Sequence, residues 1–248
     1  MLGDMLSSMF NVVGFSWITS PACTELETIV MDWLAKALHL PSFYLSETTG
    51  GGVIQDTASS GGIVAMLAAK EKKKSQLKLQ LGDAFNEGEF QSKLVAYVSD
   101  QTHSSIQKAC MVAGVLHFRK ITSNQTTFDM KHEELETKIQ EDIKNGLIPF
   151  FVCATIGTTS STAIDDISKI GPICKNYELF LHIDAAFLGP TLMLPEYRPI
   201  LAGGSECEAL NYSDSFTFNP HKWMLTNFDC SAFWIKVSRN RIIQYQQV

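Results

Sequence analysis

The sequence has the composition of a globular protein. Of its 248 residues, 45% are hydrophobic and 19% are charged, which excludes disordered, collagen-like and disulfide-stapled chains. The 26 acidic and 20 basic side chains give a formal net charge of -6, and this disfavours nucleic acid as a partner because duplex binding needs a concentrated positive surface. We interpret the dense basic stretch at 70–74 as a solvated helix end.

The six cysteines lie far apart and include no C-x-x-C pair. They predict neither a zinc site nor a disulfide framework, and a reducing, cytoplasmic setting fits them best. The N-terminus has no basic region ahead of an apolar stretch, and no run of 18 apolar residues occurs. We therefore expect neither a secretory signal nor a membrane span.

Apolar residues at helical spacing predict a helix over 22–40, directly after Pro21. The glycines at 50–52 predict a turn that leads to a second helix, which begins near 58 and ends near 74. Short apolar runs then predict buried strands, and the periodic segments between them predict helices. The strands are expected at 94–98, 150–154, 179–183 and 231–235, and the helices at 104–113, 131–144 and 167–177.

The alternation of strands and helices predicts an α/β fold. Its sheet is expected to be mainly parallel and flanked by helices on both faces, because parallel strands need crossover connections. Ligands of such sheets bind at the carboxyl ends of the strands. We expect a single domain over 1–248, with an inserted surface loop within 201–214.

Three clusters carry residue types that suit one kind of chemistry. Residues 57–60 are small and mostly hydroxylated where a helix begins, and the free N–H groups and dipole of a helix start favour a phosphate. Asp184 ends an apolar strand beside small residues, so its carboxylate either holds a flat cationic ring or caps the next turn. Lys222 lies between His221 and Trp223, where desolvation favours the neutral amine that forms a Schiff base.

A phosphate seat, a ring-binding acid and a Schiff-base lysine together describe a site for pyridoxal 5′-phosphate (PLP). With these residues the sequence resembles the group II PLP-dependent amino-acid decarboxylases, and among them the aromatic-L-amino-acid (dopa) decarboxylases. The resemblance implies the large domain of a fold type I PLP-dependent enzyme. The matching stretches are GFSWITSPACTELET (14–28), GGGVIQ with TAS (50–59), SDQTHSSIQKA (99–109), VCATIGTT (152–159), GPIC (171–174), LHIDAAF (181–187), PEYR (195–198) and NPHKWMLTNFDCSAFWIK (219–236).

The resemblance implies a role for each matching residue. Lys222 is implied to form the Schiff base with PLP, Asp184 to pair with the protonated pyridine nitrogen, and His103 to stack on the ring and face the substrate. These three are the implied catalytic residues. The further cofactor-binding residues that it implies are Ala58 and Ser59 at the phosphate and Thr155, Ala186, Asn219 and His221 around the cofactor, and Phe15 is implied to line the aromatic substrate pocket.

The resemblance also implies a reaction and an assembly. We expect decarboxylation of an aromatic L-amino acid (dopa, tyrosine, tryptophan or 5-hydroxytryptophan) to the amine and CO2 by a homodimer. Histidine decarboxylase is an alternative, favoured by Phe-Thr-Phe-Asn at 216–219 but opposed by His221, because that subgroup tends to have serine there. An aromatic aldehyde synthase is another, opposed by His103, because that branch usually has asparagine there.

The sequence departs from the family in three respects. It has about half of the family's length and lacks the N-terminal arm and the C-terminal small domain, so we expect a fragment that is catalytically weak but binds PLP or a partner subunit. Asp56 stands where relatives usually have glycine, and its carboxylate repels a phosphate. Gly61 and Gly62, near a helix start, cost about 1 kcal/mol each relative to alanine. We therefore expect weakened cofactor affinity.

Overall fold

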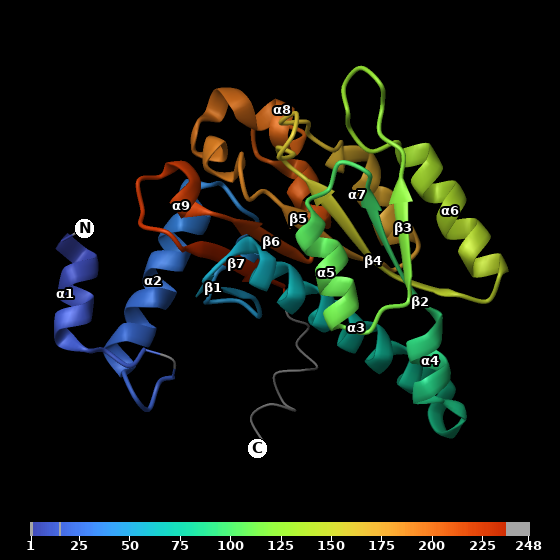
Figure 1. The fold of residues 1–248 in the computed structure, drawn as a ribbon, viewed down its shortest axis with the longest axis horizontal. Helices are drawn as coiled ribbons and strands as arrows, with labels where there is room; N and C mark the ends of the chain where they lie inside the picture. The colour runs from blue at the N-terminus through green and yellow to red at the C-terminus, as the bar shows by residue number, and fades with distance from the viewer. Residues whose placement is uncertain (1, 15, 237–248) are drawn as a thin grey trace.

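The structure is a computed structural model, and it describes residues 2–14 and 16–236. A seven-stranded sheet with the order β1-β7-β6-β5-β4-β2-β3 forms its centre (Figure 1). β7 pairs antiparallel with both β1 and β6, and the other four pairs are parallel. The mainly parallel sheet predicted from the sequence is confirmed. The strands are β1 (Gly51–Gln55), β2 (Leu94–Ser99), β3 (His117–Ile121), β4 (Ile148–Thr155), β5 (Phe180–Asp184), β6 (Ser215–Phe218) and β7 (Ser231–Ile235).

Helices cover both faces of the sheet, as the sequence predicted. One layer contains α3, α4 and α5, the other contains α2, α6, α7 and α8, and α1 lies beside α2 away from the sheet (Figure 1). No helix within the described residues is long and apolar enough to cross a membrane. The helices are α1 (Leu2–Phe10), α2 (Pro21–Ala37), α3 (Ala58–Leu81), α4 (Glu87–Lys93), α5 (Ser104–Val112), α6 (His132–Lys144), α7 (Ile167–Asn176), α8 (Arg198–Ala202) and α9 (Pro220–Trp223).

The strands contribute side chains to two separate cores because successive residues point to opposite faces. Val152 of β4 packs into the core beneath α2, α6 and α7, whereas its neighbour Phe151 packs beneath α3 and α5. In β5, Ile183 belongs to the first core. The same alternation therefore places His182 and Asp184 together on the face covered by α3.

Small residues let α3 lie close to the sheet. Gly61 and Gly62 are both buried in its first turns. A Cβ on Gly61 would lie 3.2 Å from Thr217 Oγ1 and 3.3 Å from the Phe233 ring, and one on Gly62 would lie 2.9 Å from Ile106 Cδ1 of α5. The two glycines, which the sequence presents only as a cost to helix stability, thus lie where α3 packs against the sheet and α5 with little room for a Cβ.

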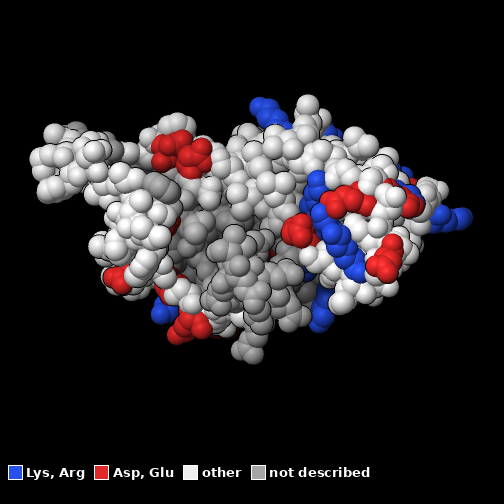
Figure 2. Space-filling view, turned by 90° about the horizontal axis from the view of Figure 1, so that it is seen from below, with Lys and Arg blue, Asp and Glu red and all other residues white. Residues whose placement is uncertain are grey.

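The basic stretch at 70–74 is not the solvated helix end that the sequence suggested. α3 continues to Leu81, so these lysines lie inside the helix. On the face shown in Figure 2, basic and acidic side chains are interspersed. Each lysine of the stretch donates to an acceptor outside α3: Lys70 to Ala113 O, Lys72 to Asp214, Lys73 to Glu178 O and Lys74 to Glu87.

The expected surface loop within 201–214 is partly buried instead. Gly203, at φ +70°, ends α8, and a 3-10 helix follows over Glu208–Tyr212. Ala209 and Leu210 of that helix belong to the core beside α7. Two apolar residues are too few to produce a recognisable period in the sequence, so their burial could not be predicted from it.

Burial makes one histidine of the sheet sensitive to acid. His182 is fully buried, and its Nδ1 lies 2.8 Å from Ser215 Oγ. Desolvation lowers the pKa of His182 to about 3, well below the value of about 6.5 in an unfolded chain. The unfolded protein therefore binds this proton more readily, and up to about 5 kcal/mol of stability is lost as the pH falls from 6.5 towards 3.

A buried carboxyl acts in the opposite direction. Burial raises the pKa of Asp165 to about 6, so its protonation favours the folded state and returns roughly 3 kcal/mol as the pH falls from 6 to 4. The effects of His182 and Asp165 on stability in acid partly cancel in the wild-type protein. A variant in which position 182 cannot take up a proton separates the two effects.

We predict that His182→Gln flattens the loss of stability in acid. Between pH 6.5 and 4.5, its free energy of unfolding in urea should fall by about 2–3 kcal/mol less than that of the wild type, because glutamine does not titrate. His132→Gln, at a partly exposed position on α6, is the control and should follow the wild-type curve. Parallel curves for the wild type and His182→Gln would contradict this prediction.

Candidate active site

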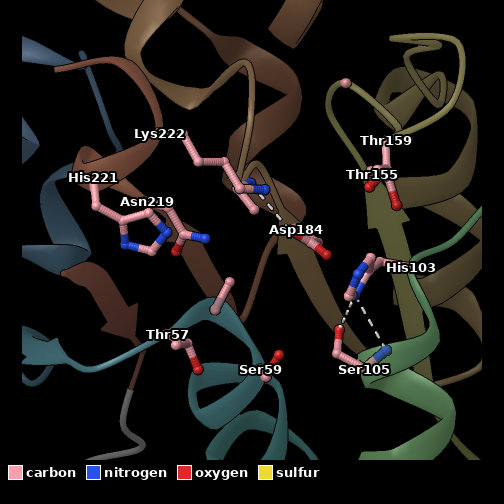
Figure 3. Close-up of a pocket in the computed structure, with 13 residues that line it drawn as sticks. Thr57, Ser59, His103, Ser105, Thr155, Thr159, Asp184, Asn219, His221 and Lys222 are labelled. Carbon is pink, nitrogen blue, oxygen red and sulfur yellow. Dashed lines mark hydrogen bonds between the residues drawn. The ribbon is translucent and has the colours of Figure 1, made fainter. Parts of the chain in front are cut away.

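A pocket of about 180 Å³ opens at the carboxyl ends of β4, β5 and β6 (Figure 3). This is the edge of the sheet at which ligands of such folds bind. The nine positions expected to bind the cofactor, at 58, 59, 103, 155, 184, 186, 219, 221 and 222, all line it. Phe15, the expected substrate-pocket residue, lies outside the described residues. The lining consists of Thr57, Ala58, Ser59, His103, Ser105, Thr155, Gly157, Thr159, Asp184, Ala186, Asn219, His221 and Lys222.

Thr57 of the predicted phosphate seat also lines the pocket, and three lining residues were not predicted: Ser105, Gly157 and Thr159. These three lie within motifs that carried the family resemblance, but nothing in the sequence shows that they face the pocket. Gly157 adopts φ +86°, and a Cβ there would lie 2.4 Å from Leu188 Cγ. Only glycine fits this turn, which brings the chain around the end of β4 to the pocket wall.

The sheet determines which polar side chains meet in the pocket. Thr155 is the last residue of β4 and Asp184 the last of β5, and the two are register partners. β6 lies on the other side of β5, and Asn219 follows it directly and precedes α9. α9 then carries His221 and Lys222 into the pocket, so that Lys222 and Asp184 face one another in Figure 3.

Asp184 is the buried charge of the site. Asp184 is 5% exposed, and its Oδ1 accepts the Ala186 N–H at 3.0 Å. Desolvation raises the pKa of Asp184, while the Ala186 N–H and the charges of Lys222 and His103 act against that rise. A carboxylate in this position is stabilised by a cationic partner.

The start of α3 brings two N–H groups that have no acceptor within the helix to the pocket wall. Thr57 caps the helix, and its Oγ1 accepts the Ser60 N–H at 3.3 Å. The N–H groups of Ala58 and Ser59 have no acceptor within the helix because they belong to its first turn. Asp56 does not line the pocket; its carboxylate accepts the Thr57 N–H at 2.8 Å, and the Ser60 hydroxyl and that N–H lower its pKa.

Two buried polar atoms of the pocket have no partner in the part of the chain that the structure describes. They are Thr155 Oγ1 and Asn219 Oδ1. Buried hydroxyl and amide oxygens are nearly always hydrogen-bonded in folded proteins. Their position in the lining indicates that a ligand with complementary polar atoms completes the site.

Both histidines of the pocket are bonded through Nδ1. His103 accepts the Ser105 N–H at 3.2 Å, and His221 accepts the Cys230 N–H at 2.9 Å. A ring nitrogen that accepts an N–H bond carries no proton, so in the neutral ring the proton lies on Nε2. The pocket therefore contains two rings whose Nε2 atoms are hydrogen-bond donors.

Comparison with known proteins identifies the family. The pyridoxal-dependent decarboxylase conserved domain matches residues 1–247. The chain belongs to this family. It is 48% identical to tryptophan decarboxylase 2 of Oryza sativa subsp. japonica, over 98% of this chain and 46% of that protein, and 47% identical to histidine decarboxylase of Mus musculus, over 95% of this chain and 35% of that protein.

A solved structure shares the fold. The crystal structure of Oryza sativa TDC with PLP and tryptamine matches with a TM-score of 0.85 and 35% identity, over 95% of this chain and 46% of that chain. The chain spans about half or less of the length of the relatives that it matches. PLP is the cofactor of this decarboxylase family.

The residues of the pocket fit PLP. The unpaired N–H groups at the start of α3 suit its phosphate, the buried carboxylate of Asp184 suits a protonated ring nitrogen, and the amine of Lys222 suits its aldehyde. The unpartnered Thr155 and Asn219 oxygens belong to the same pocket lining, so both would be available to polar atoms of the cofactor.

We predict that Asp56→Asn binds PLP about two- to fivefold more tightly than the wild type. Removal of a negative charge beside the first turn of α3 relieves repulsion of the phosphate, and a charge at a helix N-terminus has an effect of this size. Fluorescence titration with PLP measures the affinity. Asp83→Asn, at the other end of α3, is the control, and the gain should shrink in high salt. Unchanged or weaker binding by Asp56→Asn would disprove the repulsion.

Proposed function

We propose that the protein decarboxylates an aromatic L-amino acid to its amine and CO2 with PLP as cofactor. The observation that carries this proposal is the arrangement of Lys222 opposite the buried Asp184, in a pocket whose wall includes the start of α3. We assign residues 1–248 to the large, PLP-binding domain and infer that the enzyme is a homodimer. The dispersed free cysteines support a reducing, cytoplasmic location.

The protein residues have separable tasks in this reaction. Bound PLP supplies a sink for the electrons that remain on the α-carbon when CO2 leaves. Lys222 would attach the cofactor covalently, and the N–H groups of Ala58 and Ser59 would bind its phosphate. Asp184 would hold a proton on the ring nitrogen, because its buried carboxylate favours the cationic form. His103, at the start of α5, presents its Nε2 proton to the substrate side.

An aromatic substrate is supported by the comparisons, and histidine is the alternative substrate. The 48% identity to a tryptophan decarboxylase supports the aromatic class, and His221 supports it over histidine. The 47% identity to a histidine decarboxylase keeps histidine as the second candidate. Release of CO2 from carboxyl-labelled dopa, tyrosine, tryptophan, 5-hydroxytryptophan and histidine separates the two, and faster release from histidine than from all four aromatic substrates would exclude our assignment.

We predict that PLP attaches to Lys222. Treatment of the PLP-loaded protein with borohydride should leave one pyridoxyl group, located on Lys222 by peptide mapping, because this lysine shares the pocket with Asp184 and the start of α3. Lys222→Arg keeps the charge and should carry no pyridoxyl group. Labelling of another lysine in the wild type would refute the site.

We predict that Asp184→Asn impairs turnover far more than cofactor binding. Asparagine retains an oxygen for the Ala186 N–H but loses the charge that stabilises the ring cation, so turnover should fall about 10²- to 10³-fold while the dissociation constant of PLP rises less than tenfold. Asp83→Asn, which removes a carboxylate outside the pocket lining, is the matched control and should change neither quantity. Equal losses in affinity and turnover would argue against this role of Asp184.

A further inference from the structure

We propose that Ser105 is a positioning residue that determines which nitrogen of His103 faces the reacting groups. The inference rests on the proposed function only for its consequence, because its geometry is independent of the reaction. His103 is the N-cap of α5, and its Nδ1 lies 3.2 Å from the Ser105 backbone nitrogen and 2.8 Å from Ser105 Oγ (Figure 3).

The anchor is buried, whereas the ring is exposed. Ser105 is 7% exposed and lies in the first turn of α5. His103 is exposed, and the described residues offer its ring no hydrogen bond other than these two to Ser105. An exposed imidazole without such an anchor rotates and exchanges its proton between the two nitrogens. Ser105 therefore supplies the order that the ring does not obtain from packing.

The anchor determines the protonated atom. Nδ1 has one lone pair in the neutral ring, and the Ser105 N–H and hydroxyl both converge on it, so the proton resides on Nε2. Figure 3 shows the ring between Ser105 and Asp184. With Nδ1 bound to Ser105, the pocket meets a donor at Nε2. Without the anchor, a substrate would meet either a donor or an acceptor.

A purely structural role for Ser105 makes different predictions. If the serine only caps α5, its loss lowers stability and leaves the protonation of His103 unchanged. If it positions His103, its loss changes the ring and has no effect on turnover once His103 itself is gone. The neighbouring Ser104 is exposed and makes no side-chain hydrogen bond within the described residues, so it provides a matched control on the same helix turn.

The first test observes the ring directly. Long-range ¹H–¹⁵N NMR of protein with ¹⁵N-histidine, at a pH about two units above the usual histidine pKa of about 6.5, reports the neutral tautomer, and His103→Gln identifies the signals. We expect the Nε2–H form alone in the wild type, Ser104→Ala and Ser105→Thr. In Ser105→Ala the backbone N–H at 3.2 Å remains but the closer hydroxyl contact at 2.8 Å is lost, so we expect the nitrogen shifts to move towards averaged values. Ser105→Cys, nearly isosteric with a weaker donor, replaces the alanine variant if that one does not fold. A Ser105→Ala spectrum identical to the wild type overturns the proposal.

The second test places Ser105 and His103 in a double-mutant cycle. Loss of one hydrogen bond to the ring should lower kcat for decarboxylation about three- to tenfold in Ser105→Ala, with KM nearly unchanged. In the His103→Gln background the same change should cost less than twofold, because residues that act through one another are not additive. Additive losses overturn the proposal. If every variant lacks activity, the proposed function fails, and the NMR result alone decides the role of Ser105.

Discussion

A carboxylate buried at the end of a central strand is the constraint around which this site is built. Asp184 is buried in the pocket wall with little contact to water, and this desolvation raises its pKa. Its ionised form therefore depends on cations that the fold delivers from elsewhere. Because β6 pairs with β5 and Thr217 is the register partner of Asp184, the chain leaves the sheet beside this carboxylate, and Lys222 follows within five residues.

The opposite wall of the pocket depends on how closely α3 approaches the sheet. Gly61 lies against Thr217, and Thr217 is also the register partner of Asp184 in the sheet. The same strand therefore positions both the start of α3 and the carboxylate. Farther along, the ion pair between Lys72 and Asp214 holds α3 near the other end of β6. The N–H groups that suit a phosphate are thus positioned by packed secondary structure rather than by a mobile loop, as binding geometry requires.

The sequence predicted the parts of this arrangement that local patterns encode. The buried strands are continuous apolar runs, and nine pocket residues occur in contiguous motifs. β1, β3 and β6 were missed. β1 begins at two of the glycines that predicted a turn, β3 is partly exposed at the sheet edge and mixes charged with apolar residues, and the four residues of β6 alternate between serine or threonine and phenylalanine. The reversal of β7 and the contact of Ser105 with His103 depend on the path of the chain, which no local period records.

Two buried carboxyls show how the fold separates a structural task from a chemical one. Asp184 faces the pocket, whereas Asp165 accepts the Thr155 N–H at 2.8 Å and the Met130 N–H at 2.7 Å behind it. Burial raises the pKa of both, so each costs stability at neutral pH. Asp165 offsets part of that cost through two hydrogen bonds that fix the end of β4. Within the described residues the Asp184 carboxylate accepts a single hydrogen bond, from the Ala186 N–H. Its desolvation is therefore less fully compensated, and a cationic ligand in the pocket would supply the remaining stabilisation.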